Sequence, residues 1–154
     1  RVLFRSAVEI GITEISCICC ARSERTHINT ERFERLIISA MKQSLHFHRP
    51  IFHAPIQATA LMRQYATHTD WQKFIAYCGE ESSVKDLHAV AEAGKSSLIL
   101  IGPEGDFDGT EVQTAIQCGF QTVSLGNMRL RTETAALVAC CQLHFINYQH
   151  PKNS

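Results

Sequence analysis

The chain has 154 residues, 45% of them hydrophobic and 19% charged, a composition typical of one globular domain and not of a disordered chain. Its 15 Lys and Arg residues balance its 15 Asp and Glu residues, so the whole chain lacks the positive charge of a nucleic-acid binder and any such binding must be local. No apolar run approaches the roughly 18 to 20 residues of a membrane helix, and the cysteine usage fits a reducing compartment, so we expect a cytoplasmic protein.

The first residues differ from the rest of the chain. Arg1-Val-Leu-Phe-Arg-Ser6 matches the translated end of a common sequencing adapter, and Ala7-Val-Glu-Ile-Gly-Ile12 resumes as though midway through a helix. We therefore expect residues 1–6 to be a non-native processing scar. The domain itself is expected over residues 7–150.

Strands and helices alternate in the first half of the chain. Residues 14–20 are a strand candidate, and Asn29 or Thr30 caps a helix with an apolar face. That face consists of Phe33, Leu36, Ile37, Ala40 and Met41. An extended piece between Pro50 and Pro55, a helix from Gln57 to Tyr65, a strand over Phe74–Cys78 and a weaker helix from Val84 to Ala93 follow.

The second half continues the alternation. Leu98–Ile101 is a strand, and Asp108 with Glu111 predicts a capping box for a helix that ends at Gly119. Residues 121–125 form another strand, and Thr132 opens a final helix. Because that helix is apolar on nearly every side, we expect it to be buried all round, under the sheet or against a second subunit. The pattern predicts an α/β fold whose mostly parallel sheet carries helices on both faces.

Two glycine-bearing loops, Ile101-Gly-Pro-Glu-Gly105 and Leu125–Ala135, each follow a strand of this second half. Glycine lets the backbone approach a ligand closely, and open α/β sheets bind ligands at the carboxyl ends of their strands. The first loop lacks the lysine and the spacing of a phosphate loop and is not GxGxxG, which disfavours a nucleoside triphosphate. The two loops indicate the walls of a pocket, and the stiff, backbone-lined first loop suits a neutral cofactor moiety.

Each of these motifs also has a plain structural interpretation. The first loop on its own fits a tight connection between strand and helix, and Arg131 with Glu133 fits an ion pair that closes the second loop. Core packing is favoured over metal binding for Cys17–Cys20 and for Cys140, Cys141 and His144, so no metal is expected. Two groups of polar residues have two possible interpretations, a solvated face or a local RNA contact. The first group consists of Arg22, Arg25, Arg32, Arg35, Lys42 and Arg49, and the second of His46, His48 and His53.

The segments LILIGPEGDF and SLGNMRLRTETAA, in this order and at this spacing, resemble the small-subunit (16S) ribosomal RNA uridine-N3 methyltransferases of the SPOUT class. Three further segments are similar to that family. Ala7–Thr13 is similar to its KA.ELGV segment, Arg22-Ser23 to its RS motif, and Gln43-Ser44 to its EQS.R helix end. The resemblance covers residues 7–148.

The resemblance implies a SPOUT domain with a C-terminal trefoil knot, an exception to the rarity of knots, formed around Leu125–Ala135 and threaded through the loop of Ile101–Gly105. It implies S-adenosylmethionine as cofactor and a homodimer through the C-terminal helix. The cofactor residues that it assigns are Ile101, Gly102, Glu104, Gly105, Leu125, Gly126, Leu130, Arg131, Thr134 and Ala135. It also implies that the family's N-terminal PUA-like RNA-binding domain and first catalytic strand are absent here, so we expect the chain not to bind its ribosomal substrate normally.

The implied reaction is methylation of N3 of a specific uridine in 16S rRNA, with no metal and no membrane involved. Arg131 would support the uracil anion or orient the base, Glu133 would hold Arg131, and Glu104 is a candidate general base. The residues expected to contact RNA are Arg22, Arg25, Gln43, Arg49 and Arg129.

The chain departs from the family pattern at two positions in the loops. Asp106 replaces a frequent glycine, and Arg129 replaces a common isoleucine, adding positive charge beside the pocket. Two other functions stay open: a SPOUT enzyme acting on another RNA, such as a ribose 2′-hydroxyl in tRNA, and a non-catalytic RNA-binding module.

Overall fold

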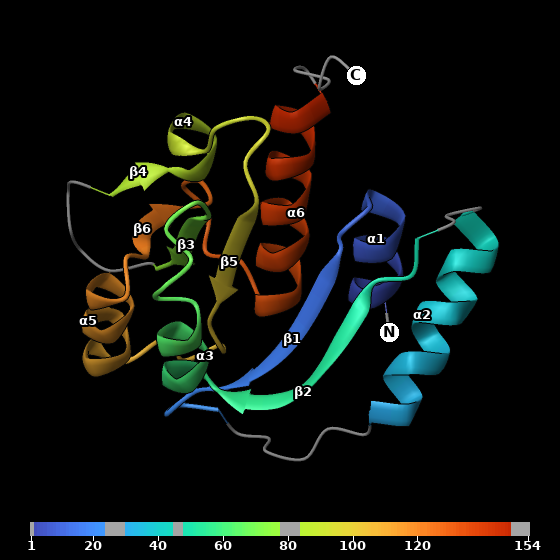
Figure 1. The fold of residues 1–154 in the computed structure, drawn as a ribbon, viewed down its shortest axis with the longest axis horizontal. Coiled ribbons are helices and arrows are strands. Elements are labelled where there is room, and N and C mark those ends of the chain that lie inside the picture. The colour runs from blue at the N-terminus through green and yellow to red at the C-terminus, as the bar shows by residue number, and fades with distance from the viewer. Residues whose placement is uncertain (1, 24–29, 45–47, 78–83, 149–154) are drawn as a thin grey trace.

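The computed structural model describes residues 2–23, 30–44, 48–77 and 84–148 of the chain. Helices and strands alternate through these residues (Figure 1), as the sequence predicts, except that the short strand β4 is the next described element after β3. The first half contains α1 (Val2–Ile10), β1 (Glu14–Cys19), α2 (Thr30–Ser44), β2 (Ile51–Gln57), α3 (Ala58–Gln64) and β3 (Gln72–Ala76). The second half contains β4 (Lys85–Asp86), α4 (Leu87–Val90), β5 (Ser97–Ile101), α5 (Gly109–Gln117), β6 (Gln121–Ser124) and α6 (Thr132–Tyr148).

The strands form two parallel sheets. β1 pairs with β2 in a two-stranded sheet, and a four-stranded sheet has the order β4-β6-β3-β5. β6 therefore lies between β3 and β4, although β5 precedes it in the chain. Because β3, β5 and β6 are parallel, their carboxyl ends lie at one edge of the sheet, and both glycine-bearing loops leave from that edge.

Helices cover both faces of the four-stranded sheet, as the sequence predicts. Alternate residues of β3 point to opposite faces: Ile75 is 0% exposed and belongs to the core cluster with Leu61 of α3 and Ala115 of α5. Phe74, 2% exposed, belongs to a second cluster with Leu87 of α4 and Ala139 of α6. The sheet that ends at the loops is thus fixed from both sides.

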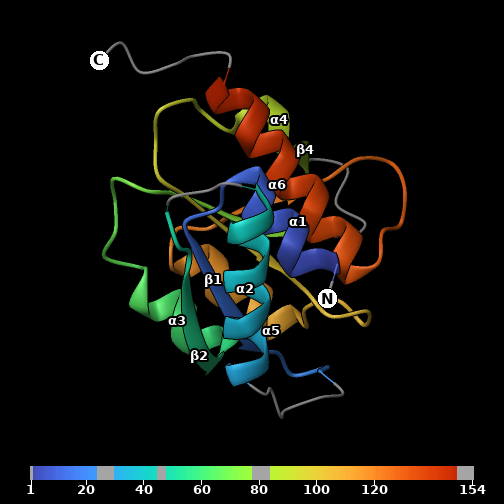
Figure 2. The ribbon, with the colours of Figure 1, turned by 90° about the vertical axis from the view of Figure 1, so that its right-hand side faces the viewer.

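A smaller third core lies beside the two-stranded sheet. Val8 of α1 and Ile37 and Ala40 of α2 are buried together, with Phe52 of β2 packed against them. Figures 1 and 2 both show α1 and α2 beside β1 and β2. The buried residues of α2 belong to its predicted apolar face. α1 also contacts α6, which joins this part of the chain to the four-stranded sheet.

Polar contacts fix the ends of several helices. Asp108 and Glu111 form the predicted capping box at the start of α5, and Gly119 follows that helix with φ of +82°. Lys73 is only 7% exposed, and its Nζ donates to the carbonyl oxygens of Tyr65 and Cys118, both at 3.0 Å. These carbonyls belong to the C-caps of α3 and α5, where a cation is favourable.

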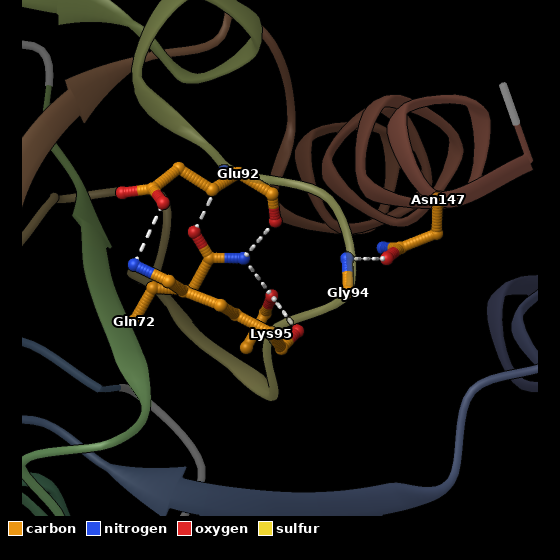
Figure 3. A network of polar contacts seen from close by, with 6 residues as sticks. Gln72, Glu92, Gly94, Lys95 and Asn147 are labelled. Carbon is orange, nitrogen blue, oxygen red and sulfur yellow. Dashed lines mark hydrogen bonds and ion pairs between the residues drawn. The ribbon is translucent and has the colours of Figure 1, made fainter. Parts of the chain in front are cut away.

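The loop before β5 is tied to β3 and to the last turns of α6 (Figure 3). The Gln72 side chain accepts from the Glu92 backbone N–H and donates to the Glu92 carbonyl, both over 2.8 Å. The Gly94 N–H donates to Asn147 Oδ1 over 2.8 Å. These bonds fix α6 relative to β5, the strand that carries the first glycine-bearing loop.

Two predictions of secondary structure need correction. The strand predicted over Phe74–Cys78 occupies Gln72–Ala76, and the helix predicted from Val84 to Ala93 shrinks to Leu87–Val90. The reason for the second difference is β4, whose Lys85 and Asp86 pair with β6 and so use the backbone groups that a longer helix would need.

The final helix is not buried all round within this chain, so the expectation of burial under the sheet is wrong, while burial against a second subunit stays a prediction. Of residues 132–148, all described, only Ala139 is buried, and Phe145 and Tyr148 are 62% and 75% exposed. α6 packs on α4, β5 and α1, and these contacts cover only part of its circumference. No helix within the described residues has the length and apolar character needed to span a membrane.

Candidate active site

A cavity of about 620 Å³ opens at the edge of the sheet where β3, β5 and β6 end. Its volume is typical of a small-molecule site. The two glycine-bearing loops form its walls, as predicted from the sequence. It is lined by Ala76, Tyr77, Val84, Ile101, Gly102, Pro103, Glu104, Asp106, Val123, Ser124, Leu125, Gly126, Asn127, Met128, Arg129, Leu130, Thr132 and Ala135.

The first loop makes a tight turn after β5. The Asp106 N–H donates to the Pro103 carbonyl over 2.9 Å, and Asp106 has φ of +61°. Asp is among the few residues that adopt this left-handed conformation at modest cost, and its Oδ1 accepts from the Phe107 N–H over 2.8 Å. Asp106, at the position where the family often has glycine, therefore keeps the backbone conformation that glycine favours.

Gly102 begins this turn at a position where a side chain would be crowded. A Cβ at this position would lie 3.1 Å from two carbons of the Phe107 ring, which is 1% exposed and would have to shift by a few tenths of an ångström. Gly102 also lines the cavity without a side chain between its backbone and the cavity, as expected for a loop that binds a ligand through its main chain.

The second loop is shaped by Gly126 and attached to the first by Thr132. Gly126 has φ of +125°, a conformation that residues with a Cβ rarely adopt, and its N–H donates to Ser124 Oγ over 3.0 Å. Thr132, the first residue of α6, donates from Oγ1 to the Gly102 carbonyl over 2.9 Å. The two walls of the cavity are therefore directly bonded.

The lining fits a cofactor with apolar, neutral polar and charged parts. Apolar side chains such as Leu125 and Leu130 alternate with exposed backbone at Gly102 and Gly126, and the charged lining residues are Glu104, Asp106 and Arg129. The lining therefore offers apolar and polar surface in similar measure, a combination that suits a cofactor with both kinds of group. The described residues contain no cluster of His, Cys, Asp or Glu that would hold a metal ion.

Most of the predicted cofactor residues line the cavity: Ile101, Gly102, Glu104, Leu125, Gly126, Leu130 and Ala135. Gly105, Arg131 and Thr134 lie outside this lining. The Gly105 carbonyl instead accepts from Arg22 Nη1 over 2.8 Å. Arg131 and Glu133, both described and exposed, form no ion pair with each other, so the structure gives no support to the ion-pair interpretation of this loop.

The residues predicted to contact RNA fall into two groups. Arg22 lies against the first loop, and Arg129 lies in the cavity lining. Gln43 is exposed near the end of α2, and Arg49, just before β2, approaches Glu34 of α2 at 3.9 Å. Arg25 lies outside the described residues.

Sequence reasoning missed several residues of the cavity. Tyr77 comes directly after β3, and the rule that parallel strands present their carboxyl ends at one edge was a sufficient reason to include it. Ser124, Asn127 and Thr132 flank predicted positions in the second loop. Their inclusion needed only the expectation that a whole loop lines a pocket.

Cys20 is buried in the core, and Cys17, Cys19, Cys140 and Cys141 are half-buried. Burial, followed by the nearby Glu111 carboxylate, raises the pKa of the Cys20 thiol from its ordinary value of 9.0 to about 12. Burial likewise raises the pKa of Cys140 to about 11. Protonated thiols are poor nucleophiles and poor metal ligands, which supports the packing interpretation of both cysteine groups.

Comparison with known proteins gives one consistent result. A family model described as an RNA methyltransferase domain matches residues 1–144. The ribosomal RNA small subunit methyltransferase E of Aquifex aeolicus is 32% identical over 142 residues, covering 88% of this chain and 58% of that protein. The family resemblance predicted from the two loops is thereby confirmed.

Two solved structures have the same fold. A probable rRNA-methyltransferase from Porphyromonas gingivalis superposes with a TM-score of 0.90 and 41% identity, covering 97% of this chain and 62% of that one. A ribosomal RNA small subunit methyltransferase E from Neisseria gonorrhoeae, bound to S-adenosyl methionine, superposes with a TM-score of 0.80 and 27% identity. That match covers 94% of this chain and 60% of the other. The chain thus spans about three fifths of the length of these relatives.

Proposed function

The chain belongs to the RNA methyltransferase domain family, and on that premise we propose that it binds S-adenosylmethionine in the cavity and methylates small-subunit ribosomal RNA. The target that we propose is N3 of a specific uridine in 16S rRNA, a cytoplasmic substrate. The observation that carries the proposal is the cavity itself, whose two glycine-bearing walls are bonded through Thr132 and Gly102.

The cofactor would be held mainly by the backbone of the two loops. The backbone of Gly102, Leu125 and Gly126 lines the cavity and would contact an adenine and a ribose, and Leu130 and Ala135 supply apolar contact. When bound, S-adenosylmethionine supplies an electrophilic methyl group on a sulfonium. We also assign Gly105, Arg131 and Thr134 to this site by family position.

The reaction requires the protein to position two reactants and to stabilise the negative charge that develops on the uracil. N3 must lose a weakly acidic proton before it attacks, so a nearby cation lowers the barrier. We propose Arg131 for that role, because it is exposed immediately before α6, between the lining residues Leu130 and Thr132. Glu104, on the cavity wall, is the candidate base.

Glu133 and the remaining basic residues complete the proposed substrate site. Glu133 makes no ion pair with Arg131 in this chain, so a role in holding that residue would require a rearrangement when substrate binds. Arg22 and Arg129, beside the loops, are better placed to meet a phosphate near the target base than Gln43 and Arg49 at the end of α2 and before β2. Arg25 is proposed by family position alone.

We propose that the chain is a knotted homodimer. Phe145 and Tyr148 leave apolar surface of α6 exposed, and a second copy would cover it. The trefoil knot around Leu125–Ala135 is proposed by family position.

The test is methylation of small ribosomal subunits by the full-length protein with labelled S-adenosylmethionine, followed by mass spectrometry of the modified nucleotide. We expect 3-methyluridine at one position. A methyl group on a ribose 2′-hydroxyl, or turnover on tRNA alone, would establish the SPOUT enzyme with another RNA substrate. A folded dimer that binds RNA but no cofactor would establish a non-catalytic module.

A further inference from the structure

We propose that Arg22 is a positioning residue for the cofactor, which acts by holding the first loop from outside the cavity. Its guanidinium Nη1 donates to the Gly105 carbonyl over 2.8 Å, across 83 positions of sequence. This inference rests on the proposed function, in which the first loop binds S-adenosylmethionine. It gives Arg22 a role separate from the RNA contact expected from the family.

The turn that carries Arg22 is itself rigid. After β1, the Ser23 N–H donates to the Cys20 carbonyl over 3.0 Å, and the Cys20 N–H donates to Ser23 Oγ over 2.9 Å. Cys20 is 8% exposed and packs in the main core. The backbone at Arg22 is therefore held in place, and the side chain extends from it to the first glycine-bearing loop.

A second bond attaches the same turn to the far end of the loop. The Ala21 N–H donates to Glu111 Oε1 over 2.9 Å, and Glu111 Oε2 accepts from the Asp108 N–H over 3.0 Å. Glu111 is 5% exposed and has no cationic partner among the described residues. Its buried carboxylate instead accepts backbone N–H groups from both segments, which fixes the turn at the start of α5.

The middle of the loop depends on Arg22. At its start Gly102 is held by Thr132, and at its end Asp106 bonds to Pro103 and Phe107. Glu104 and Gly105 are exposed, and the Arg22 guanidinium is the donor that the described residues provide to the Gly105 carbonyl.

Gly105 also packs directly on the Arg22 side chain. A Cβ on Gly105 would lie 3.4 Å from Arg22 Cβ and 3.5 Å from its Cδ, so the aliphatic part of the arginine covers the glycine. The Arg22 side chain thus holds Gly105 both by packing and by a hydrogen bond. Loss of the side chain removes both, and the centre of the loop then samples conformations that do not match the cofactor.

The test compares Arg22→Ala and Arg22→Lys with Arg63→Ala, an exposed arginine of α3 outside the cavity lining. In the full-length protein without RNA, calorimetry with S-adenosylmethionine is expected to give about tenfold weaker binding for Arg22→Ala. Arg22→Lys, which keeps one donor and most of the stem, recovers part of this loss. Arg63→Ala binds like the wild type.

Hydrogen exchange of the free protein separates this proposal from the proposed function. The amides of residues 104–107 are expected to exchange faster in Arg22→Ala, with the exchange of α6 unchanged; this measurement requires no cofactor. Unchanged exchange and unchanged cofactor affinity, with weaker RNA binding, would overturn the positioning role and leave an RNA contact. If wild type binds no S-adenosylmethionine, the proposed function fails, and the exchange data alone decide whether Arg22 holds the loop. If Arg22→Ala does not fold, cofactor affinity and hydrogen exchange are both measured on Arg22→Lys.

Discussion

The Thr132 hydroxyl donates a 2.9 Å hydrogen bond to the Gly102 carbonyl, which joins two loops 30 residues apart in sequence. Gly102 follows β5, and Thr132 begins α6. Both residues line the cavity, so the bond fixes the separation of its two walls. A side chain with the same shape and no hydroxyl would leave the Gly102 carbonyl without this donor.

Thr132→Val is therefore expected to weaken cofactor binding. The substitution removes a partly buried hydrogen bond worth about 1 kcal/mol, equivalent to roughly fivefold in affinity. Thr132→Ser keeps the hydroxyl and is expected to bind nearly as well as the wild type. Calorimetry with S-adenosylmethionine measures both. Equal loss in the two variants would mean that the methyl group, and not the bond, matters.

Gly102→Ala is expected to disturb the first loop. The new Cβ would meet the buried Phe107 ring at 3.1 Å, so the ring or the loop backbone would have to shift. Overpacking of this kind costs about 1–3 kcal/mol of unfolding free energy and shifts the loop away from the cofactor. Urea denaturation and cofactor titration measure the two effects.

Gly109→Ala is the matched control for that change. Gly109 begins α5, and a Cβ there would meet nothing within 4 Å. Alanine favours the helix, so unfolding free energy is expected to rise by up to about 1 kcal/mol. If both glycine variants lost stability equally, the contact with Phe107 would not be the cause.

Asp106 is expected to tolerate glycine better than alanine. Its φ of +61° strains a residue with a Cβ, and the aspartate offsets part of that strain through the bond from Oδ1 to the Phe107 N–H. Asp106→Ala loses the bond and keeps the strain, so a cost of about 1–2 kcal/mol is expected. Asp106→Gly loses the bond and relieves the strain. A higher melting temperature for Asp106→Ala than for Asp106→Gly would contradict this expectation.

The sequence allowed prediction of those features that depend on local patterns. The apolar face of α2, the capping box of Asp108 and Glu111, and the left-handed Gly119 are set by residues within one or two turns of each other. Both cavity walls were predicted for the same reason, since each is a strand followed by a glycine-bearing loop.

Features that depend on distant partners were not predictable. β4 exists because Lys85 and Asp86 lie beside β6, and no local pattern marks a two-residue strand. The bond from Arg22 to Gly105 crosses 83 positions, and the contact of Lys73 with Cys118 crosses 45. The partial exposure of α6 has the same origin, because the apolar composition of a helix does not specify which of its sides packs on distant elements.

Lys73→Met is expected to destabilise the fold strongly. The buried ammonium donates to carbonyls at the ends of α3 and α5, and it has no carboxylate partner among the described residues. Methionine fills the space and leaves those carbonyls without a donor, at a cost of about 3 kcal/mol. Urea denaturation measures the loss.

Lys95→Met is the control for the loss of a lysine charge. Lys95 is exposed and pairs with Glu92 at 2.7 Å, a surface ion pair visible in Figure 3. Such pairs contribute less than about 1 kcal/mol. If the two lysine variants lost similar stability, capping of the two helices by Lys73 would not be important.

Cys20 is expected to make stability fall at alkaline pH. Burial raises the pKa of its thiol in the folded chain from 9.0 to about 12, so above pH 9 the unfolded chain releases a proton that the folded chain retains. Ionisation then favours the unfolded state, and the stability contributed by the neutral thiol is lost as pH rises from about 9 towards 12. Cys20→Ala lacks this group, so its difference in unfolding free energy from the wild type should shrink by about 1 kcal/mol between roughly pH 8 and 10. Urea denaturation of both proteins across that range measures the difference, in which the titration of all other groups cancels. A difference that stayed constant would mean that the thiol ionises equally in the folded and unfolded chains.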